Sequence, residues 1–446
     1  MRAAFADSLK PGVQPRELLG WAMYDFANSG YTTVVITAVF AAYFVGSVAG
    51  GASWATLAWT LGLSLSYAIV MLTMPGLGAW ADRHAAKKRL LLLFTVGCVL
   101  STAALAWVQP GQVALGLVLL VISNTFYSWG ESLTAAFLPE LARPSAMGRV
   151  SGWGWALGYV GGMLTLGICL AYVLAAQARQ EPASQFVPVT MWITAAIYAL
   201  AASVTFALMK EHAQPNHLAD HPEGFMANLL RMRQVWRDSA PYVDFRQLMA
   251  CAVAYQAGVA VAIALAAIYA EQVVGFAPQE TMVLIFVLNI AAFVGAFVFG
   301  HVQDKLGHKR ALAWTIAGWI LTCVLAAAST GKGLFWVAAA VAGLFLGASQ
   351  SAGRAMAGLL VPPQRLAEFF GLWTLAIRLA SILGPLSYGL ITWATGGNHR
   401  LAIASTALLF VLGLWLLRPV NMARGIAAAE ASSRVGPRSH NDHPSL

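Results

Sequence analysis

Four charged residues lie inside long apolar stretches of the sequence: Asp25, Glu131, Arg354 and Arg378. A charged side chain at the centre of a membrane-spanning helix costs roughly 2.5 to 3.5 kcal/mol on insertion scales, so we expect these residues to face a cavity or one another. An arginine can hold a carboxylate through two parallel hydrogen bonds, and an acid can hold an ammonium group. An amino acid is therefore a ligand that would suit the two signs together.

Polar residues at helical spacing accompany these charges. Positions i, i+3 and i+7 of a helix lie on one face, as do positions one turn apart. Such residues can line a cavity, or they can hydrogen-bond neighbouring helices. The candidate substrate and coupling residues are Asp25, Asn28 and Thr32 on one stretch, Asn124, Tyr127 and Glu131 on a second, Gln350 and Arg354 on a third, together with Tyr255, Gln256 and Arg378.

The elements that position these residues follow from the composition. Only 10% of the 446 residues are charged and 59% are hydrophobic, with 41 glycines. About a quarter of the residues of a soluble domain are charged, so an ordinary soluble globule is excluded and a polytopic membrane protein is indicated. Continuous apolar runs, rather than alternating segments of about ten residues, disfavour a transmembrane β-barrel.

Gaps between charges, divided at turn-rich points, predict twelve membrane-spanning helices. The expected spans are 20–45, 54–79, 89–109, 112–137, 149–176, 188–209, 246–270, 280–301, 310–329, 333–358, 370–394 and 400–418. Only Arg179, Lys332 and Arg400 fall on one side, and most other Lys and Arg residues fall on the opposite side. The positive-inside rule then places both termini in the cytoplasm, so the net charge of +9 indicates topology and no nucleic-acid partner.

An internal repeat divides the chain into two halves of six helices. At an offset of 222 residues Gly78-x-x-x-Asp82-Arg83 matches Gly300-x-x-x-Asp304-Lys305, and at an offset of 223 Gly130-Glu131 matches Gly353-Arg354 and Gly161 matches Gly384. Repeated six-helix halves are typical of the major facilitator architecture.

The doubled loop resembles the signature that follows helices 2 and 8 in that superfamily. The second copy is complete with Gly307, whereas Ala85 stands at the corresponding place of the first copy. We interpret the two loops, with Gly78, Asp82, Arg83, Gly300, Asp304, Lys305 and Gly307, as a cytoplasmic gate motif. The alternative is a basic loop that only sets topology.

The repeat also places Glu131 and Arg354 at equivalent positions of helices 4 and 10. We therefore expect them on opposite sides of a central cavity, as an ion pair or as the two ends of a site that a zwitterion bridges. Three roles remain open for the pair: a substrate or proton site, an inner gate, and structural pairing.

Longer strings are more specific: Trp21 to Ser29 (WAMYDFANS), Phe137 to Glu140 (FLPE), Gly148 to Gly152 (GRVSG), Gly158 to Gly162 (GYVGG), and Glu368 to Gly371 (EFFG) with Gly384 and Pro385. These strings resemble the vacuole effluxer-like family of major facilitators. The resemblance implies secondary transport, with amino-acid efflux ascribed to the fungal vacuolar members. The chain departs from the family at Gln256-Ala257, where Asn-Asp is frequent, and at Arg378, where Lys is frequent. The resemblance therefore assigns neither a substrate nor a coupling ion.

The remaining segments complete the predicted organisation. We expect a cytoplasmic N-terminus (1–18), an N-terminal half (19–209), a cytoplasmic linker (210–243), a C-terminal half (244–418) and a disordered cytoplasmic tail (419–446). Phe225, Leu229, Met232 and Trp236 predict a basic amphipathic helix in the linker. Cys98, Cys169, Cys251 and Cys323 fall in separate spans and are expected to be buried thiols. No metal or cofactor site is predicted.

These observations predict a monomeric transporter, not an enzyme, in a bacterial inner membrane. We expect it to move a small polar solute, such as an amino acid or related metabolite, by alternating access coupled to protons. The alternatives are a drug or organic-ion exporter of the same fold, and a transporter-like receptor that binds without translocation.

Overall fold

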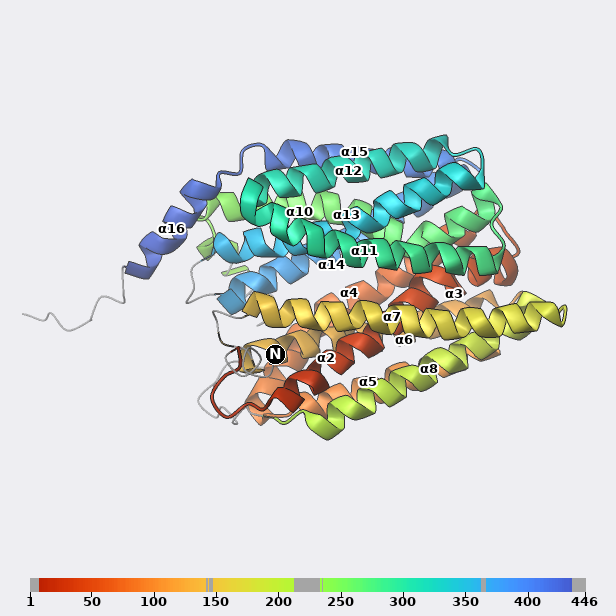
Figure 1. Cartoon of the computed structure of the whole chain (residues 1–446), viewed down its shortest axis with the longest axis horizontal. Coiled ribbons are helices and arrows are strands. Elements are labelled where there is room, and N and C mark those ends of the chain that lie inside the picture. Colours follow the sequence, from red (N-terminus) through yellow and green to blue (C-terminus); the bar gives the residue numbers. More distant parts are fainter. Residues whose placement is uncertain are drawn as a thin grey trace, which may run out of the picture.

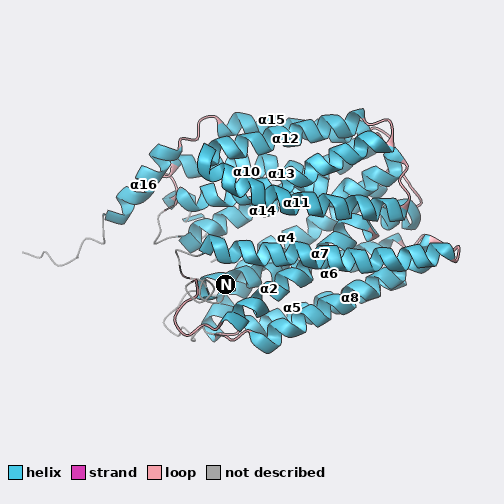
Figure 2. Ribbon diagram, viewed as in Figure 1, coloured by secondary structure: helices cyan, strands magenta, loops and turns pink. Residues whose placement is uncertain are grey.

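Long apolar helices account for most of the chain. The computed structural model describes residues 8–141, 143, 147–211, 233, 234, 236–361 and 366–434. Within these residues, 12 helical segments are long and apolar enough to cross a membrane. The predicted all-α membrane fold is confirmed, and Figure 2 shows the helices lying side by side as one bundle.

The first six spans consist of α2 (Pro15–Tyr31) with η1 (Thr32–Ala38), α3 (Phe40–Tyr43) and η2 (Phe44–Val48), then α4 (Ala55–His84), α5 (Lys87–Ala104) with η3 (Leu105–Trp107), α6 (Val113–Leu141), α7 (Met147–Ala178) and α8 (Ala183–Leu208). The second six consist of α10 (Val243–Tyr269) with η5 (Ala270–Val274), α11 (Pro278–Leu306), α12 (His308–Ala328), α13 (Lys332–Leu359), α14 (Leu366–Ala394) and α15 (His399–Leu417). The last helix is α16 (Met422–Arg434).

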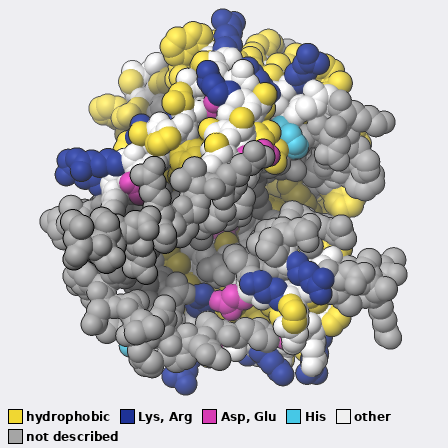
Figure 3. All heavy atoms as spheres, turned by 90° about the vertical axis from the view of Figure 1, so that its left-hand side faces the viewer, with side chains coloured by type: hydrophobic (Ala, Val, Ile, Leu, Met, Phe, Trp, Pro, Cys, Tyr) yellow, Lys and Arg dark blue, Asp and Glu magenta, His cyan; other side chains and the backbone are white. Residues whose placement is uncertain are grey.

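The bundle has two distinct ends. The end that carries residue 8, the end of α8, the start of α10 and α16 is called the linker end, and it lies at the left of Figure 1. The opposite end is called the loop end. Lys and Arg side chains gather around the linker end (Figure 3), which agrees with the predicted charge asymmetry. The assignment of this end to the cytoplasm stays a prediction.

Several helices extend beyond their expected bounds. The first span begins at Pro15 rather than near residue 20, because Gln14 and Glu17 form a capping box at its start. The sixth begins at Ala183 and contains Pro188, which was expected to mark its first residue. At the linker end α4 and α11 continue to His84 and Leu306, past the apolar stretches that predicted them.

The first and seventh spans contain π-helical segments, which no sequence pattern predicted. In the first span η1 begins at Thr32, and η2 follows after one turn of α-helix. In the seventh, η5 ends at Gly275 with φ at 77°. Segments of this kind are rare and occur frequently at functional sites.

Apolar packing joins the two halves at the loop end. One cluster of buried side chains contains the core of the N-terminal half together with loop-end residues of the C-terminal half, including Leu265, Ile268 and Tyr388. The linker-end residues of the C-terminal half, including Phe245, Trp319 and Phe369, form a separate cluster of their own. The structure is therefore closed between the halves at the loop end, and the apolar cores are separate at the linker end.

Equivalent glycines support both halves of the repeat. A methyl group on Gly130 of α6 would collide with the hydroxyl of Tyr24 on α2, and one on Gly353 of α13 would collide with the hydroxyl of Tyr255 on α10. Gly161 and Gly384, a second matched pair, press against the backbone carbonyls of Phe26 and Ala257. Close helix packing is therefore the role of these glycines.

The predicted disordered tail is wrong for residues 422–434, which form α16. Arg424 donates two hydrogen bonds of 2.8 Å to the carboxylate of Asp244, whose side chain is 3% exposed. Gly425 lies against Leu360 at the end of α13. The alanine-rich segment folds because its helix supplies the counter-charge of a buried acid. Residues 435–446 lie outside the described residues.

The predicted amphipathic helix of the linker falls mainly on residues 212–232, which are outside the described residues. Residues 233, 234 and 236–238 are helical. The guanidinium of Arg246 lies 4.3 Å from the ring centroid of Trp236, which ties the end of the linker to α10. The four cysteines are free and buried, as expected.

The two loops of the doubled motif turn at the same place. Ala85 has φ at 45° and its counterpart Gly307 has φ at 87°. A left-handed backbone costs a residue with a side chain roughly 1 to 2 kcal/mol, and glycine adopts it freely. The departure of the first copy from the motif therefore places an alanine in a conformation that favours glycine.

Replacing Ala85→Gly should stabilise the protein by roughly 0.5 to 1 kcal/mol, since relief of strain exceeds the added entropy of the unfolded chain. Gly307→Ala should destabilise it by about 1 to 3 kcal/mol. Thermal unfolding of the detergent-solubilised variants measures both. A lower midpoint for Ala85→Gly than for the wild type would contradict the explanation.

Candidate functional site

An ion pair joins the two halves of the protein near the middle of the bundle. The carboxylate of Glu131 on α6 lies 2.5 Å from the guanidinium of Arg378 on α14. At roughly 1.5 Å per residue, Glu131 lies about 15 Å from the linker-end terminus of α6, and Arg378 about 18 Å from that of α14. Two charges of opposite sign thus meet in the linker-end part of the candidate spans Val113–Ala135 and Leu372–Ala394, where each is costly unless it is paired.

The structure pairs Glu131 with Arg378, and it does not test the pairing with Arg354 that the repeat suggests. The repeat suggested Arg354, whose side chain lies outside the described residues, so that contact stays a prediction. Arg378 was a candidate in its own right, but nothing in the repeat linked it to Glu131. The contact arises because α14 packs beside α4 and reaches α6 across the interface between the halves.

Aromatic residues surround the ion pair. The hydroxyl of Tyr127, one turn before Glu131, donates a hydrogen bond of 3.3 Å to its carboxylate. The ring of Tyr127 stacks on that of Tyr31, with centroids 4.9 Å apart. On the other side, the guanidinium of Arg378 lies 5.8 Å from the ring centroid of Tyr67 on α4. Glu131 remains 36% exposed and Arg378 15% exposed, so the acid is the more accessible charge.

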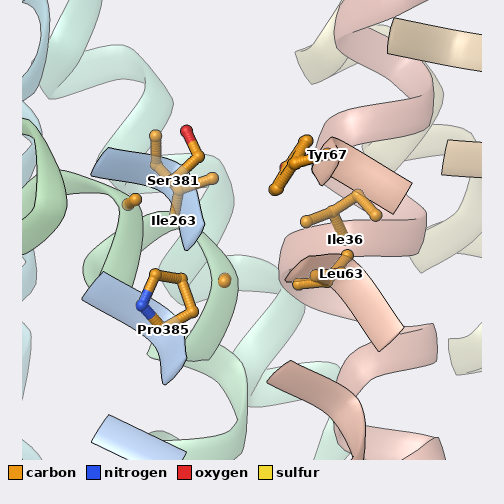
Figure 4. A pocket seen from close by; sticks show the side chains of 8 residues that line it. Ile36, Leu63, Tyr67, Ile263, Ser381 and Pro385 are labelled. Carbon is orange, nitrogen blue, oxygen red and sulfur yellow. The ribbon is translucent and has the colours of Figure 1, made fainter. Parts of the chain in front are cut away.

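A small cavity lies next to the pair and between the halves. Its volume is about 60 Å³. The lining residues are Ile36, Leu63, Tyr67, Ala260, Ile263, Ala264, Ser381 and Pro385. Figure 4 shows Ile36, Leu63 and Tyr67 of the N-terminal half facing Ile263, Ser381 and Pro385 of the C-terminal half. A water molecule takes roughly 30 Å³, so the halves must separate before an organic solute can occupy this place.

The candidates on the first span lie inside the N-terminal half. Asp25 lies against Gly154 of α7. The side-chain oxygen of Asn28 accepts a hydrogen bond of 2.8 Å from Tyr198 on α8, and the hydroxyl of Thr32 bonds to the backbone carbonyl of Asn28. The structure therefore joins Asn28 to a helix neighbour rather than to the ion pair.

Asn124 and the glutamines form two further contacts between helices. The amide nitrogen of Asn124 donates to the hydroxyl of Ser66 on α4. Gln256 on α10 and Gln350 on α13 exchange amide hydrogen bonds of 3.0 and 3.4 Å, and Gln256 also donates to the hydroxyl of Tyr255. These hydrogen bonds join helices within one half.

The gate motif is described only in part. Gly78, Asp82 and Arg83 lie near the end of α4, and Gly300, Asp304 and Lys305 near the end of α11, both at the linker end. Their side chains lie outside the described residues, so the gate role stays a prediction.

The sequence patterns do not predict Tyr67, Tyr31 or Ser381, which lie near the ion pair or line the cavity. Tyr67 follows Ser64 and Ser66 within an apolar run, and this cluster of polar residues is the one feature of the sequence that could have indicated a polar helix face there.

Breaking the pair should show which arginine neutralises Glu131. Glu131→Arg or Arg378→Glu alone should destabilise the protein by about 1 to 3 kcal/mol, less than the 3 to 5 kcal/mol of a fully buried pair because Glu131 is partly exposed. The double exchange should recover most of this loss, measured as the thermal midpoint of each purified variant.

The matched control is the exchange of Glu131→Arg with Arg354→Glu, which tests the pairing that the repeat suggested. We expect no recovery from this second exchange. Recovery there, without recovery for the pair with Arg378→Glu, would contradict the contact in the structure.

Comparison with known proteins agrees with this architecture. The family described as "Vacuole effluxer Atg22 like" matches residues 42–430. An uncharacterized MFS-type transporter, YxiO, of Bacillus subtilis is 28% identical, covering 89% of this chain and 93% of the relative. Autophagy-related protein 22-1 of Neosartorya fischeri is 22% identical, covering 91% of this chain and 80% of the relative.

Solved structures show the same fold. The nucleoside transporter NupG superposes with a TM-score of 0.65 at 14% identity, covering 92% of this chain and 99% of that protein. A peptide transporter, POT, in complex with alafosfalin superposes with a TM-score of 0.64 at 15% identity, covering 96% and 99%. The expectation of a membrane transporter with the major facilitator fold, and not of an enzyme, is confirmed. The chain belongs to the Atg22-like vacuole effluxer family.

Proposed function

We propose that this protein is a proton-coupled secondary transporter of a small zwitterionic solute, an amino acid or a related metabolite. The single observation that carries the proposal is the Glu131–Arg378 ion pair, which joins the two halves within the apolar spans. In an alternating-access transporter the substrate binds near the midplane between the halves. The pair lies between the halves on the linker-end side of that plane, where a substrate bound between the halves would meet it.

The two charges match the two ends of an amino acid. The planar guanidinium of Arg378 can bind a carboxylate through two parallel hydrogen bonds, and the carboxylate of Glu131 can bind an ammonium group. A zwitterion inserted between them would satisfy both charges while the halves separate. The binding energy then comes from replacing one ion pair by two, so little charge is left uncompensated.

Proton coupling follows from competition between a proton and Arg378 for the carboxylate of Glu131. Glu131 is the more exposed of the two side chains, so a proton can reach it. A proton on this carboxylate would break the ion pair and free the guanidinium for a substrate carboxylate, and loss of that proton would let Glu131 hold the ammonium group. Binding of one proton would therefore precede occupation of the site.

The closed loop end supplies the second requirement of alternating access. Gln177 on α7 donates a hydrogen bond of 2.8 Å to Gln279 on α11, from one half to the other. Gly389 on α14 packs against Thr60 and Leu57 on α4. These contacts are neutral and small, so they can break without exposing a charge. With the linker end in the cytoplasm, the structure corresponds to a state closed toward the outside.

The opposed charges of Glu131 and Arg378 argue against the drug-exporter alternative, because pockets for drug-sized ligands are lined predominantly by hydrophobic and aromatic side chains.

Glu131→Gln should separate binding from coupling. In proteoliposomes the variant should retain exchange of a labelled amino acid and lose pH-driven accumulation at least about tenfold, equivalent to roughly 1.4 kcal/mol. Glu280→Gln is the control, since it removes an acid whose 2.6 Å pair with Lys332 is exposed at the loop end. Full pH-driven uptake by Glu131→Gln would exclude this coupling, and saturable binding without flux would indicate a receptor.

Cross-linking the loop end should stop transport. In Gln177→Cys with Gln279→Cys, a short cleavable thiol cross-linker should abolish flux, and cleavage should restore it. The wild type is a suitable control because its four cysteines are buried. Undiminished flux through the cross-linked protein would show that the loop end does not open during transport.

A further inference from the structure

A lengthwise groove separates α5 and α8 on the outer surface of the N-terminal half. Its volume is about 220 Å³, larger than the roughly 150 Å³ of an apolar cavity that holds a benzene molecule. Its walls include Leu92, Val96 and Leu100 of α5 and Ala199, Ser203 and Phe206 of α8. The two helices lie along the lower edge of the bundle in Figure 1. We call this feature the α5–α8 groove.

The α5–α8 groove faces the hydrocarbon of the bilayer. Leu92 is 48% exposed, Leu100 is 64% exposed and Leu200, beside the groove, is 68% exposed. Exposed leucines along membrane-spanning helices contact lipid chains. The material that reaches this groove is therefore an apolar chain from the membrane, not a dissolved solute.

Two cations stand at the linker end of the groove. Arg89 precedes Leu92 by one turn of α5, and Lys210 lies two residues after the end of α8 at Leu208. Both are exposed, and neither has an ion-pair or hydrogen-bond partner among the residues that the structure describes.

Their neighbours are engaged. Lys87 pairs with Glu140 at 2.6 Å, Lys88 donates to the backbone carbonyl of Met209, and Glu211 accepts a hydrogen bond from the backbone of Lys88. Arg89 and Lys210 are thus left to bind an anion.

We propose that the α5–α8 groove binds an anionic phospholipid, with one acyl chain between the helices and the phosphate held by Arg89 and Lys210. Basic residues between membrane helices bind anionic head groups, because the cation and the lipid charge meet at the edge of the hydrocarbon. The groove adds apolar contact along the chain of the same molecule. The combination of an apolar channel with cations at one end therefore selects a lipid over either a free anion or a neutral lipid.

Comparison of the two halves of the repeat shows that the pair of cations beside the groove belongs to the N-terminal half. At the offset of 222 residues Ala311 stands where Arg89 would be, and Arg310 corresponds to Lys88. The C-terminal half therefore lacks the first of the two cations. Arg310 is exposed at the same end of the bundle on α12, which makes it a matched control.

The first experiment measures binding of phosphatidylglycerol and of phosphatidylcholine with the same chains to the purified full-length protein, by native mass spectrometry. Arg89→Ala with Lys210→Ala should weaken phosphatidylglycerol binding by about 30-fold, roughly fivefold for each cation, and leave phosphatidylcholine unchanged. Arg310→Ala should bind both lipids like the wild type. Arg89→Lys with Lys210→Arg should retain binding, which shows that charge and not local folding is responsible.

The second experiment tests the groove without changing any charge. Ala199→Trp places an indole in the α5–α8 groove and should also weaken phosphatidylglycerol binding at least about fivefold. Equal binding of the two lipids by the wild type, or an equal loss in Arg310→Ala, would overturn the proposal in favour of non-specific annular lipid. Competition by inorganic phosphate or glycerophosphoglycerol at the strength of the intact lipid would overturn it in favour of a free-anion site. These measurements do not involve transport, so they test the lipid proposal independently of the proposed function.

Discussion

Charge inside a bilayer must be neutralised by another part of the protein, and this requirement governs how the two halves meet. The carboxylate of Glu131 and the guanidinium of Arg378 satisfy each other across the interface, 2.5 Å apart. A contact of this kind is strong only while both partners remain in place, because either charge alone is expensive at that depth. The ion pair therefore holds the halves together in the closed state, and a charged substrate can replace it by binding to both side chains.

The packing around the pair lets that exchange take place without loss of either half. Within each half the helices approach closely at matched glycines, where Gly130 meets Tyr24 and Gly353 meets Tyr255. Between the halves the contacts are apolar or neutral, as with Gln177 and Gln279. Rigid halves and a separable interface are the physical conditions for alternating access. Among the residues that the structure describes, Glu131 and Arg378 form the one ion pair between the halves, so a substrate that separates them can bias the balance between states.

Sequence patterns predicted the helices and their repetition well, because both depend on local or additive properties. Apolar length alone locates a span, and glycine spacing survives as self-similarity even where other residues have diverged. Ala85 is an example: its backbone has a positive φ, as does that of Gly307, which occupies the equivalent position of the second half. Helix ends were predicted less accurately, since α4 and α11 continue beyond the apolar stretch through residues whose partners are distant in sequence. The sequence of the tail does not predict α16 for the same reason, because Asp244, whose carboxylate binds Arg424, lies far away along the chain.

The sequence by itself determined the membrane class, the two six-helix halves and the short list of charges that cannot face lipid, since these follow from composition and periodicity. Only the tertiary structure decided which charges meet. The internal repeat suggests Arg354 as a partner of Glu131, whereas the packing of α14 against α4 brings Arg378 to Glu131. A repeat relates each half to the other but carries no information about how the halves dock. That geometry depends on surfaces built from many helices at once, and it decides which of the buried charges becomes the partner of Glu131.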